Sequence, residues 1–557
     1  MPFKTKDLEG LLEAYALLTS ALDLKTVLTE VLRKAGAQLK AEASSIMLLD
    51  EASGELVYEV ALGEAGLRIM EQQRLKAGVG LAGWVAGNLK PLSVEDAYKD
   101  ARFFPGFDKK TGFLTKSVLC MPLLAKDRLL GVAEIINKKD GASFTPGDQA
   151  LFAKYCEVAA IAIDNALLHG KALEQDRLQH DMRIAEQIQS ASLPSDIPSI
   201  RNLRVECRSI ACRYVAGDVV DITRLPDGRL AVLVADVSGK GVPAALFGAK
   251  FSADFEYLAQ ADPEGGALFN RLNAIVTRRS KQGIFITAVY AVIDPASGVV
   301  EYVNAGHLPP VIVGPLAGGC RLAGASGYPP LGVMEDLNYK STRLTLAQGE
   351  RIVFMTDGVW DARSLSGARL GPEKAQGILA DCPELAVPRL MKAITKFTAG
   401  VPLADDITVV GVGYGDYEER TFPSQTKSLA QARQFVEKLA LAHGFDDRHT
   451  GAILLALTEA ASNIIKHTYR MNPDERIRIG VGRGPDQFSI HIRDWGDRQD
   501  PGRFVSRDLA DIRPGGLGVR YIREVMDVVE FDDKLWDGNE LHMLVRGKRN
   551  KTNADKN

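Results

Sequence analysis

This sequence has few cysteines that could form disulfide bonds and no long apolar run. Its 557 residues include only six cysteines, none of them in a C-x-x-C pair, and a chain of this size does not need disulfides. No apolar run reaches the roughly 18–20 residues of a membrane span, and the start MPFKTKDLEG has no apolar signal region. We therefore expect reduced thiols, a cytoplasmic location and no membrane partner.

A strong charge of one sign is also missing. The chain has 68 Lys and Arg residues against 71 Asp and Glu residues, and 46% of it is apolar. This balance is typical of globular proteins and predicts no nucleic-acid partner. Because domains usually contain about 100–200 residues, the length predicts several folded units rather than one core.

Residues 1–169 have the pattern of one α+β unit. Apolar residues recur at helical spacing over residues 7–40, and the period then changes to two in SSIMLLD, GELVYEVAL, KSVLCMPLL and LGVAEIINK. A helical pattern from about Asp148 to His169 closes the unit. We predict an antiparallel sheet with flanking helices.

This unit resembles a GAF sensor domain in GVGLAGWVAGNLKPLSVEDA (78–97) and SVLCMPLLAKDRLLGVAEIINKKDGASFTPGDQ (117–149). Within the second stretch, Asn137, Lys138, Phe144 and Asp148 resemble the N-K…F…D-E pattern of phosphodiesterase-type GAF domains, with Gln149 in place of Glu. The resemblance implies a small ligand of unknown identity, and a cyclic nucleotide is one hypothesis. The alternative is that Lys138 and Asp148 form an ion pair that braces the sheet.

Residues 170–198 are predicted to link this unit to the next. The segment 170–192 is polar and helical with a thin apolar seam, and LPSDIPSI contains two prolines that end the helix. One interpretation is a solvated linker helix; the other is a dimeric, coiled-coil signalling helix that carries the state of the sensor into the next domain. The seam consists of Leu173, Leu178, Met182, Ala185 and Ile188.

Between residues 199 and 418, acidic residues lie at the borders of predicted strands. Asp236 and Asp357 each follow an apolar run, and Asp405-Asp406 precedes ITVVGVG. Carboxylates that meet at one sheet edge repel unless cations neutralise them, and oxygen ligands favour Mg²⁺ or Mn²⁺. A pair of such ions can activate water for phosphate hydrolysis. The alternative for each residue alone is a turn or a helix cap.

Five motifs in this region resemble, in family order, those of SpoIIE-type members of the PPM serine/threonine phosphatases. The motifs are GDVVD (217–221), ADVSGKGVPAALFGA (235–249), NAGHLPP (304–310), TDGVWDA (356–362) and ADDITVV (404–410). The resemblance implies an αββα sandwich that holds two Mn²⁺ or Mg²⁺ ions.

By that resemblance Asp236 would bridge both metals, with Asp218 at the first. Asp357 and Asp405 would bind the second metal, and the carbonyl of Val237 would complete the first site. Either Asp405 or Asp406 could face inward, so both remain candidate ligands. His307 is a candidate proton donor or a residue that supports the loop.

The remaining residues, 419–557, contain a second constellation. Glu459 and Asn463 lie four apart in the helical pattern DDRHTGAILLALTEAASNIIKHTY, and so share a face. They precede a strand, FSIHIRDWGD, and a glycine-rich turn, PGGLGVRYIREVMD, which lets backbone amides approach phosphate. The alternative for Glu459 and Asn463 is a solvated helix face.

The series E-A-A-S-N, D-W-G and G-G-L-G resembles the N, G1 and G2 boxes of GHKL ATPases, specifically anti-sigma-factor serine kinases, and implies an α/β sandwich that binds ATP with Mg²⁺. Glu459 would be the general base toward a serine and Asn463 would bind Mg²⁺. Asp494 would contact adenine, and Gly538-Asn539 replaces the Gly-Thr of the family. The implied nucleotide-binding glycines are Gly496, Gly516 and Gly518.

The sequence thus predicts a multidomain α+β protein that resembles bacterial partner-switching regulators. The implied substrate is a phosphorylated STAS-type anti-sigma-factor antagonist. A different hypothesis treats the C-terminal module as a non-catalytic, nucleotide-dependent binding platform for a sigma factor or a STAS partner.

Overall fold

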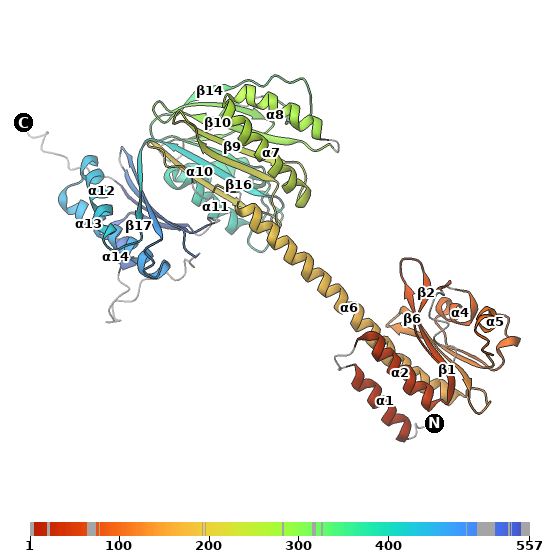
Figure 1. The fold of residues 1–557 in the computed structure, drawn as a ribbon. Coiled ribbons are helices and arrows are strands. Elements are labelled where there is room, and N and C mark those ends of the chain that lie inside the picture. The colour runs from red at the N-terminus through yellow and green to blue at the C-terminus, as the bar shows by residue number, and fades with distance from the viewer. Residues whose placement is uncertain are drawn as a thin grey trace, which may run out of the picture. The chain divides into compact units, whose positions relative to one another are not determined.

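The computed structural model has two compact units, Met1–His180 and Asp181–Asn557 (Figure 1). The fold is multidomain α+β, as the sequence predicts. The structure describes residues 5–18, 23–63, 74–76, 78–191, 193–194, 197–280, 283–314, 319–324, 327–485, 487–497, 518–532, 535 and 537–546.

The first unit is built on a six-stranded antiparallel sheet in the order β3-β2-β1-β6-β5-β4. Its central strands, β1 and β6, contain runs of consecutive buried residues, because both faces of the sheet are covered. The strands are β1 (Ala41–Asp50), β2 (Glu55–Leu62), β3 (Arg74–Lys76), β4 (Leu92–Val94), β5 (Val118–Ala125) and β6 (Arg128–Lys138).

Helices cover both faces of this sheet. Helix α2 and the first part of α6 form one core with the sheet, while α4 packs on the other face. Asp23 caps α2 by accepting a hydrogen bond from the backbone of Thr26. The α-helices are α1 (Thr5–Leu17), α2 (Leu24–Gln38), α4 (Gly80–Asn88), α5 (Gly106–Thr111) and α6 (Pro146–Ala191), with a short 3₁₀ turn, η1 (Ala97–Lys99).

The boundary expected after His169 does not interrupt the secondary structure. Helix α6 contains 46 residues and continues through most of the expected linker (Figure 1). The sequence between His169 and Ala191 has no proline, so nothing ends the helix before Pro194.

The ion pair considered for the GAF-like unit is present. Lys138 Nζ lies 2.7 Å from Asp148 Oδ2, and the backbone and hydroxyl of Thr145 donate to the same carboxylate oxygen. Burial would raise the pKa of Asp148, but these donors outweigh it, so the pKa lies below its usual value. Lys138 and Asp148 therefore join the end of β6 to the start of α6.

The second unit begins with a sandwich of two five-stranded sheets, β14-β11-β10-β9-β8 and β13-β12-β15-β16-β7, in which the neighbouring strands are antiparallel. The first sheet contains β8 (Asp218–Arg224), β9 (Leu230–Val237), β10 (Ile286–Ile293), β11 (Val299–Ala305) and β14 (Thr342–Thr345). The second contains β7 (Leu203–Ile210), β12 (Val311–Val313), β13 (Cys320–Leu322), β15 (Arg351–Met355) and β16 (Ile407–Tyr414).

Three apolar layers hold the sandwich together. One core lies between the sheets, one lies between the first sheet and the helices α7 and α8, and one lies under the helices on the second sheet. This arrangement is the predicted αββα sandwich. The helices are α7 (Val242–Ala261), α8 (Gly265–Arg279), α9 (Gly358–Asp361), α10 (Gly371–Asp381), η2 (Pro383–Leu385) and α11 (Ala386–Phe397).

The last module has the sheet order β17-β18-β19-β21-β20, with helices packed on one face. Its first strand begins at Asp416, two residues before the domain boundary expected after residue 418, because β17 pairs along its length with β18. The strands are β17 (Asp416–Pro423), β18 (Arg476–Gly484), β19 (Gln487–Asp494), β20 (Val528–Asp532) and β21 (Asn539–Arg546). The helices are α12 (Ser428–His443), α13 (Asp447–Asn463), η3 (Ile464–Thr468) and α14 (Gly518–Val525).

A buried network of charges joins the phosphatase-like sandwich to the last module. Arg208 on β7 is 1% exposed. Its guanidinium donates to Asp532 on β20 over 2.9 Å and to Glu540 on β21 over 3.1 Å. Since removing one member of a buried ion pair leaves an uncompensated charge, Arg208 fixes how these two modules dock.

Replacing Arg208 by alanine is expected to destabilise the second unit by about 3–5 kcal/mol, because Asp532 and Glu540 would remain buried without their cation. Urea denaturation of the full chain measures this change. Arg201→Ala, at an exposed arginine of the preceding turn, is the matched control and should leave the midpoint unchanged. Adding Asp532→Asn to Arg208→Ala should recover part of the loss, and equal midpoints for Arg208→Ala and wild type would contradict this role.

None of the described helices is both long enough and apolar enough to cross a membrane.

Candidate functional site

The ends of four strands bring the predicted carboxylates together in the phosphatase-like sandwich. Asp218 opens β8 and lies opposite Asp236 in the β8–β9 ladder. In the other sheet, the backbone N–H of Thr356 donates to the carbonyl of Thr408 over 3.0 Å. That bond holds the end of β15, and so Asp357, beside the segment that carries Asp405 and Asp406.

The electrostatics of these groups show how closely they converge. Burial and the carboxylates of Asp357, Asp405 and Asp406 raise the pKa of Asp236 to about 7, against a lowering contribution from Lys240. Burial and Asp236 hold the pKa of Asp218 well above its ordinary value, although Thr356 donates to Asp218 Oδ2 over 2.9 Å. The metal-free site is therefore short of positive charge.

Asp405 and Asp406 have different surroundings. Asp406 is buried, and its two carboxylate oxygens accept the backbone N–H groups of Cys212 and Gly217 over 2.7 and 2.6 Å. Asp405 is half-buried and pairs with Lys240, with 2.8 Å between Nζ and Oδ2. Asp405 thus meets an ammonium group that a metal cation could replace, whereas both oxygens of Asp406 hold the loop before β8.

The backbone near Asp236 also offers an oxygen. A Cβ atom on Gly217 would lie 3.2 Å from the carbonyl oxygen of Val237 and 3.7 Å from Asp236 Oδ1. Both oxygens thus border the same small space beside Gly217.

The donor set fits hard divalent cations. Its carboxylate and carbonyl oxygens suit such ions, its carboxylates repel one another, and the ammonium of Lys240 pairs with one of them. The thiol sulfur of Cys212 lies within 4.8 Å of carboxylate oxygens of Asp405 and Asp406. Asp218, Asp236, Asp357, Asp405 and the Val237 carbonyl are the groups that can hold such ions.

His307 is buried in the same sandwich. Its Nδ1 lies 2.9 Å from the hydroxyl of Thr287, and its backbone N–H donates to Asn304. Burial lowers the pKa of His307 to about 4, so the ring is neutral at physiological pH. These contacts favour the role of supporting the loop over that of a proton donor.

In the last module, α13 presents Glu459 and Asn463 one turn apart, and both side chains are half-buried. The opposite side of this helix is packed into the core by Ile453, Leu454 and Leu457. The helix changes to π geometry directly after Asn463, in η3, a distortion that is frequent at functional sites.

Asp494 ends β19 and is buried. Burial raises its pKa to about 6, although Asn539 Nδ2 and the backbone N–H of Gly496 donate to its Oδ1 over 2.9 and 3.0 Å. Asn539 therefore supplies a donor at the position where the family has threonine. Both of these hydrogen bonds are accepted by Oδ1, and none of the described residues is seen to donate to Asp494 Oδ2.

The glycine-rich turn is only partly described. Gly516 lies outside the described residues, and Gly518 is the first residue of α14. Gly496 closely approaches Thr468, because a Cβ atom there would lie 2.2 Å from Thr468 Cγ2. A larger residue at position 496 would have to displace the end of η3.

A cavity of about 90 Å³ lies in the GAF-like unit. Its wall includes Tyr58 on β2 and the buried Glu134 on β6, whose carboxyl accepts a hydrogen bond from the hydroxyl of Ser45 over 3.2 Å. Burial raises the pKa of Glu134. The remaining wall is mainly apolar, so the cavity suits a small ligand with few polar groups.

Sequence reasoning missed the residues that support the two sites. Lys240 was part of a recognised motif, but its contact with Asp405 depends on two segments that are far apart in the chain. The donor Thr356 adjoins the predicted site residue Asp357, and this proximity was the available signal, whereas Asn539 had been recognised at the Gly-Thr position of the family. Gln189, in the last turn of α6, pairs its side-chain amide with the backbone of Ala216 and had no signal at all.

Three family models match the chain in succession. The model for the GAF domain matches residues 23–163, that for Stage II sporulation protein E (SpoIIE) matches residues 226–414, and that for the histidine kinase-like ATPase domain matches residues 422–545.

Among curated proteins, Protein IcfG of Synechocystis sp. is 28% identical over 264 residues, which cover 42% of this chain and 39% of that protein. The probable 3',5'-cyclic phosphodiesterase pde-5 of Caenorhabditis elegans is 31% identical over 158 residues, or 27% of this chain and 22% of that protein. The matches thus span less than half the length of each of these two relatives.

Among solved structures, the RsbU and RsbW domains of Rv1364c from Mycobacterium tuberculosis are 18% identical, with a TM-score of 0.36 over 63% of this chain and 94% of that one. The order of the domains rests on the three family models. The chain therefore contains a GAF domain, a SpoIIE-type PPM protein phosphatase domain and a histidine kinase-like ATPase domain, in this order.

Proposed function

We propose that the chain is a metal-dependent protein serine/threonine phosphatase whose site consists of Asp218, Asp236, Asp357, Asp405 and the carbonyl of Val237. The observation that carries this proposal is the convergence of carboxylates that raises the pKa of Asp236 to about 7. Such a cluster is stabilised by divalent cations. Two Mn²⁺ or Mg²⁺ ions would supply an activated water and neutralise charge on the phosphoryl group.

The protein's own residues prepare this chemistry. Thr356 orients Asp218 through its hydroxyl, and Asp406 fixes the loop before β8 through the backbone of Gly217. Lys240 pairs with Asp405 and can release that carboxylate when a cation takes its place. These contacts limit the reorganisation needed before phosphate hydrolysis.

Hydrolysis of para-nitrophenyl phosphate and of a phosphorylated STAS protein by the full chain tests the proposal. Turnover should require Mn²⁺ or Mg²⁺ and disappear after chelation. Turnover that survives chelation would contradict it.

We infer that the substrate is a phosphorylated STAS-type anti-sigma-factor antagonist and that the protein acts in the cytoplasm. Support comes from the combination of a SpoIIE-type domain with a histidine kinase-like ATPase domain in one chain. A sigma factor is a further candidate partner. The small ligand of the GAF domain would occupy the cavity beside Glu134 and regulate the phosphatase.

For the C-terminal domain we propose binding of ATP with Mg²⁺ through Asn463, Asp494, Gly496, Gly516 and Gly518, and serine phosphorylation with Glu459 as general base. The half-buried pair on α13 and the buried Asp494 support this assignment. The second candidate is a non-catalytic platform that binds its partner when nucleotide is present. This candidate is favoured by Asn539, which stands where the family has threonine, because its side-chain amide already donates a hydrogen bond to Asp494 Oδ1.

We also propose that the protein is a homodimer held by α6. Leu178 is 55% exposed on this helix, and several other apolar side chains of α6 are exposed as well. Burying such a seam between two helices would stabilise a coiled coil. Of the predicted seam, Leu173 and Ile188 are exposed too, and Met182 and Ala185 are half-buried.

The variant Leu178→Glu is expected to dissociate the dimer, because it would bury a carboxylate in the apolar seam. Light scattering after size exclusion measures the mass of the full chain. Gln179→Glu, at the neighbouring exposed position, should remain dimeric. A monomeric wild type, or a dimer unaffected by Leu178→Glu, would contradict this interface.

A further inference from the structure

The cavity of the GAF domain has two carboxyl groups in a wall that is otherwise mainly apolar. Glu134 on β6 is 9% exposed and Asp108 on α5 is 8% exposed, so both carboxyls are largely withdrawn from water. Among the described residues that line the cavity, none is Lys, Arg or His. A bound anion would therefore find no cation in this part of the wall, and an ionised carboxyl would repel it.

The carboxylate of Asp108 is fully used within the protein. It accepts hydrogen bonds from the backbone N–H and the hydroxyl of Thr115, both over 2.7 Å, and from the hydroxyl of Tyr98 over 3.0 Å. These bonds tie α5 to the segment that leads into β5. Asp108 therefore stabilises the wall of the cavity and has little capacity left for a ligand.

The carboxyl of Glu134 has weaker partners. It accepts a hydrogen bond from the hydroxyl of Ser45 over 3.2 Å, and the thiol sulfur of Cys120 lies 3.6 Å from its Oε1. Burial raises the pKa of Glu134, and these two donors do not offset the effect. None of the described residues contributes a positive charge that would lower this pKa. Glu134 is therefore a buried acid whose oxygens can accept further hydrogen bonds from a ligand.

Aromatic rings adjoin this acid in the cavity. Burial and, after it, the carboxyl of Glu134 raise the pKa of Tyr58 well above its ordinary value, so the two groups lie close together. Three phenylalanines, Phe103, Phe104 and Phe113, also line the cavity. The face of an aromatic ring attracts a cation, and its carbon atoms bury apolar surface. The volume of about 90 Å³ has room for roughly six to nine water-sized groups.

We propose that the cavity of the GAF domain binds a small primary amine with a compact apolar body, whose ammonium group pairs with Glu134. The apolar body would lie among the phenylalanine rings. As the ammonium enters, the acid proton of Glu134 leaves for solvent, so the buried pair has no net charge. Because the carboxyl is already buried, only the ammonium has to be desolvated, and the aromatic faces offset part of that cost. The inference rests on the proposed role of this cavity as the ligand site and adds the chemical class of the ligand.

The test compares three probes of similar size in binding to the full chain. Benzylamine has a positive charge, benzyl alcohol has none and benzoate has a negative charge. Ligand-observed nuclear magnetic resonance, which also measures weak binding, gives each dissociation constant. Benzylamine should bind at least about 10-fold more tightly than benzyl alcohol, because its hydrogen bonds to the carboxylate are charge-assisted. Benzoate should bind most weakly of the three.

The variant Glu134→Gln keeps the shape of the side chain but cannot become negatively charged. It should weaken the binding of benzylamine about 10–100-fold and leave that of benzyl alcohol within about threefold of wild type. Binding of the alcohol also shows that the cavity of the variant is folded. Glu95→Gln, at an exposed carboxylate of the same domain, is the matched control and should bind all three probes as wild type does.

Equal affinities of the wild-type chain for benzylamine and benzyl alcohol overturn the proposal, as does tighter binding of benzoate, cyclic AMP or cyclic GMP than of benzylamine. A preference for benzylamine that persists in Glu134→Gln overturns it too, because the ammonium would then lie elsewhere. Absence of binding by every probe rejects the amine and the ligand role of the cavity together. These measurements do not involve phosphate hydrolysis, so the proposed phosphatase function stands or falls separately.

Discussion

Replacing Asp236 by asparagine is expected to abolish metal-dependent phosphatase activity, with kcat/KM reduced by at least about 1000-fold, or about 4 kcal/mol of transition-state stabilisation. Asp236 interacts electrostatically with Asp357, Asp405 and Asp406, so its loss would remove a central carboxylate from the groups that would hold the metal ions. Steady-state hydrolysis of para-nitrophenyl phosphate and Mn²⁺ titration of the variant measure the effect.

A second readout separates this loss from unfolding. Because the pKa of Asp236 is raised to about 7 in the folded chain, its ionisation destabilises the metal-free protein as pH rises from about 4 to about 7. Asp236→Asn removes this penalty, so its metal-free melting temperature near pH 8 should equal or exceed that of wild type.

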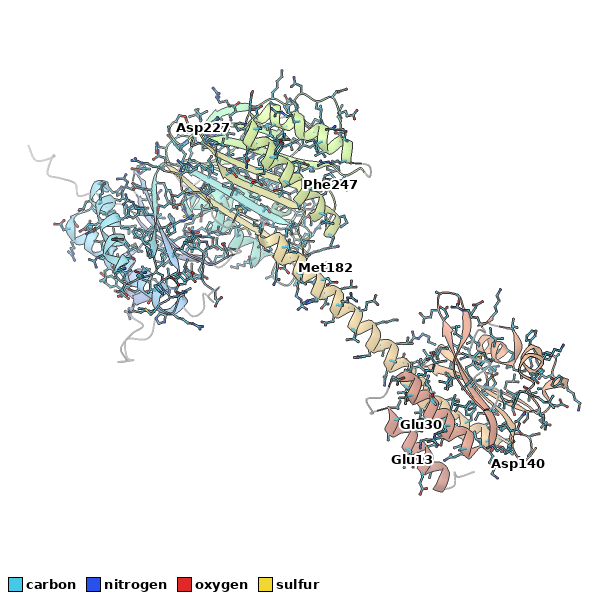
Figure 2. The ribbon with its side chains drawn as sticks, viewed as in Figure 1. Glu13, Glu30, Asp140, Met182, Asp227 and Phe247 are labelled. Carbon is cyan, nitrogen blue, oxygen red and sulfur yellow. The ribbon has the colours of Figure 1, made fainter. Side chains whose placement is uncertain are left out.

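The matched control is Asp227→Asn. Asp227 lies in the turn between β8 and β9, at the far end of both strands from Asp236, and is exposed beside Arg229 (Figure 2). It should keep wild-type turnover. Activity in Asp236→Asn equal to that of the control would remove Asp236 from the proposed metal site.

Replacing Glu459 by glutamine is expected to reduce phosphate transfer from ATP to a STAS partner by about 100–10,000-fold, the usual contribution of a general base. The amide of glutamine keeps the size of the side chain but cannot take the serine proton. Transfer of radioactive phosphate measures catalysis, and isothermal titration with ATP measures binding. Nucleotide affinity and partner binding should survive, since Asp494 and Asn463 are unchanged.

The control for this variant is Glu437→Gln on α12, an exposed carboxylate within the same domain. It should transfer phosphate at the wild-type rate. A wild-type chain that binds ATP but never phosphorylates a STAS partner would instead favour the binding platform, and Glu459→Gln would then have no effect on partner capture.

One proposed activity removes phosphate from a serine and the other adds it, so a chain that contains both must regulate which of the two operates. The buried pairs of Arg208 with Asp532 and Glu540 hold the phosphatase and ATPase domains together. The contact of Gln189 with Ala216 reaches the phosphatase site from α6.

The identity and order of the domains could be predicted from the sequence. Strand periodicity and turn residues predicted the antiparallel sheet of the GAF domain, and the acidic motifs at strand borders predicted where carboxylates gather. These features are local, because a strand or a turn depends on residues within a few positions of one another. The helical stretches predicted at 148–169 and 170–192 form one continuous helix, α6, because no proline or other helix-ending residue separates them.

Within the candidate site, the sequence left Asp405 and Asp406 as alternatives, and only the tertiary structure separated their surroundings. Adjacent residues at the start of a strand point in different directions, so one carboxylate meets Lys240 and the other meets the backbone of Cys212 and Gly217. No periodicity distinguishes them, because their partners lie far away in the chain.

What the sequence by itself determined is therefore the set of domains, their order and the segments that supply each site. The tertiary structure decided which atoms meet: Lys240 with Asp405, Asn539 with Asp494, and Gln189 with Ala216. The physical reason is that secondary structure follows from local patterns, whereas a contact between distant segments depends on how sheets and helices pack. That packing minimises the free energy of the whole chain, and no short stretch of sequence contains it.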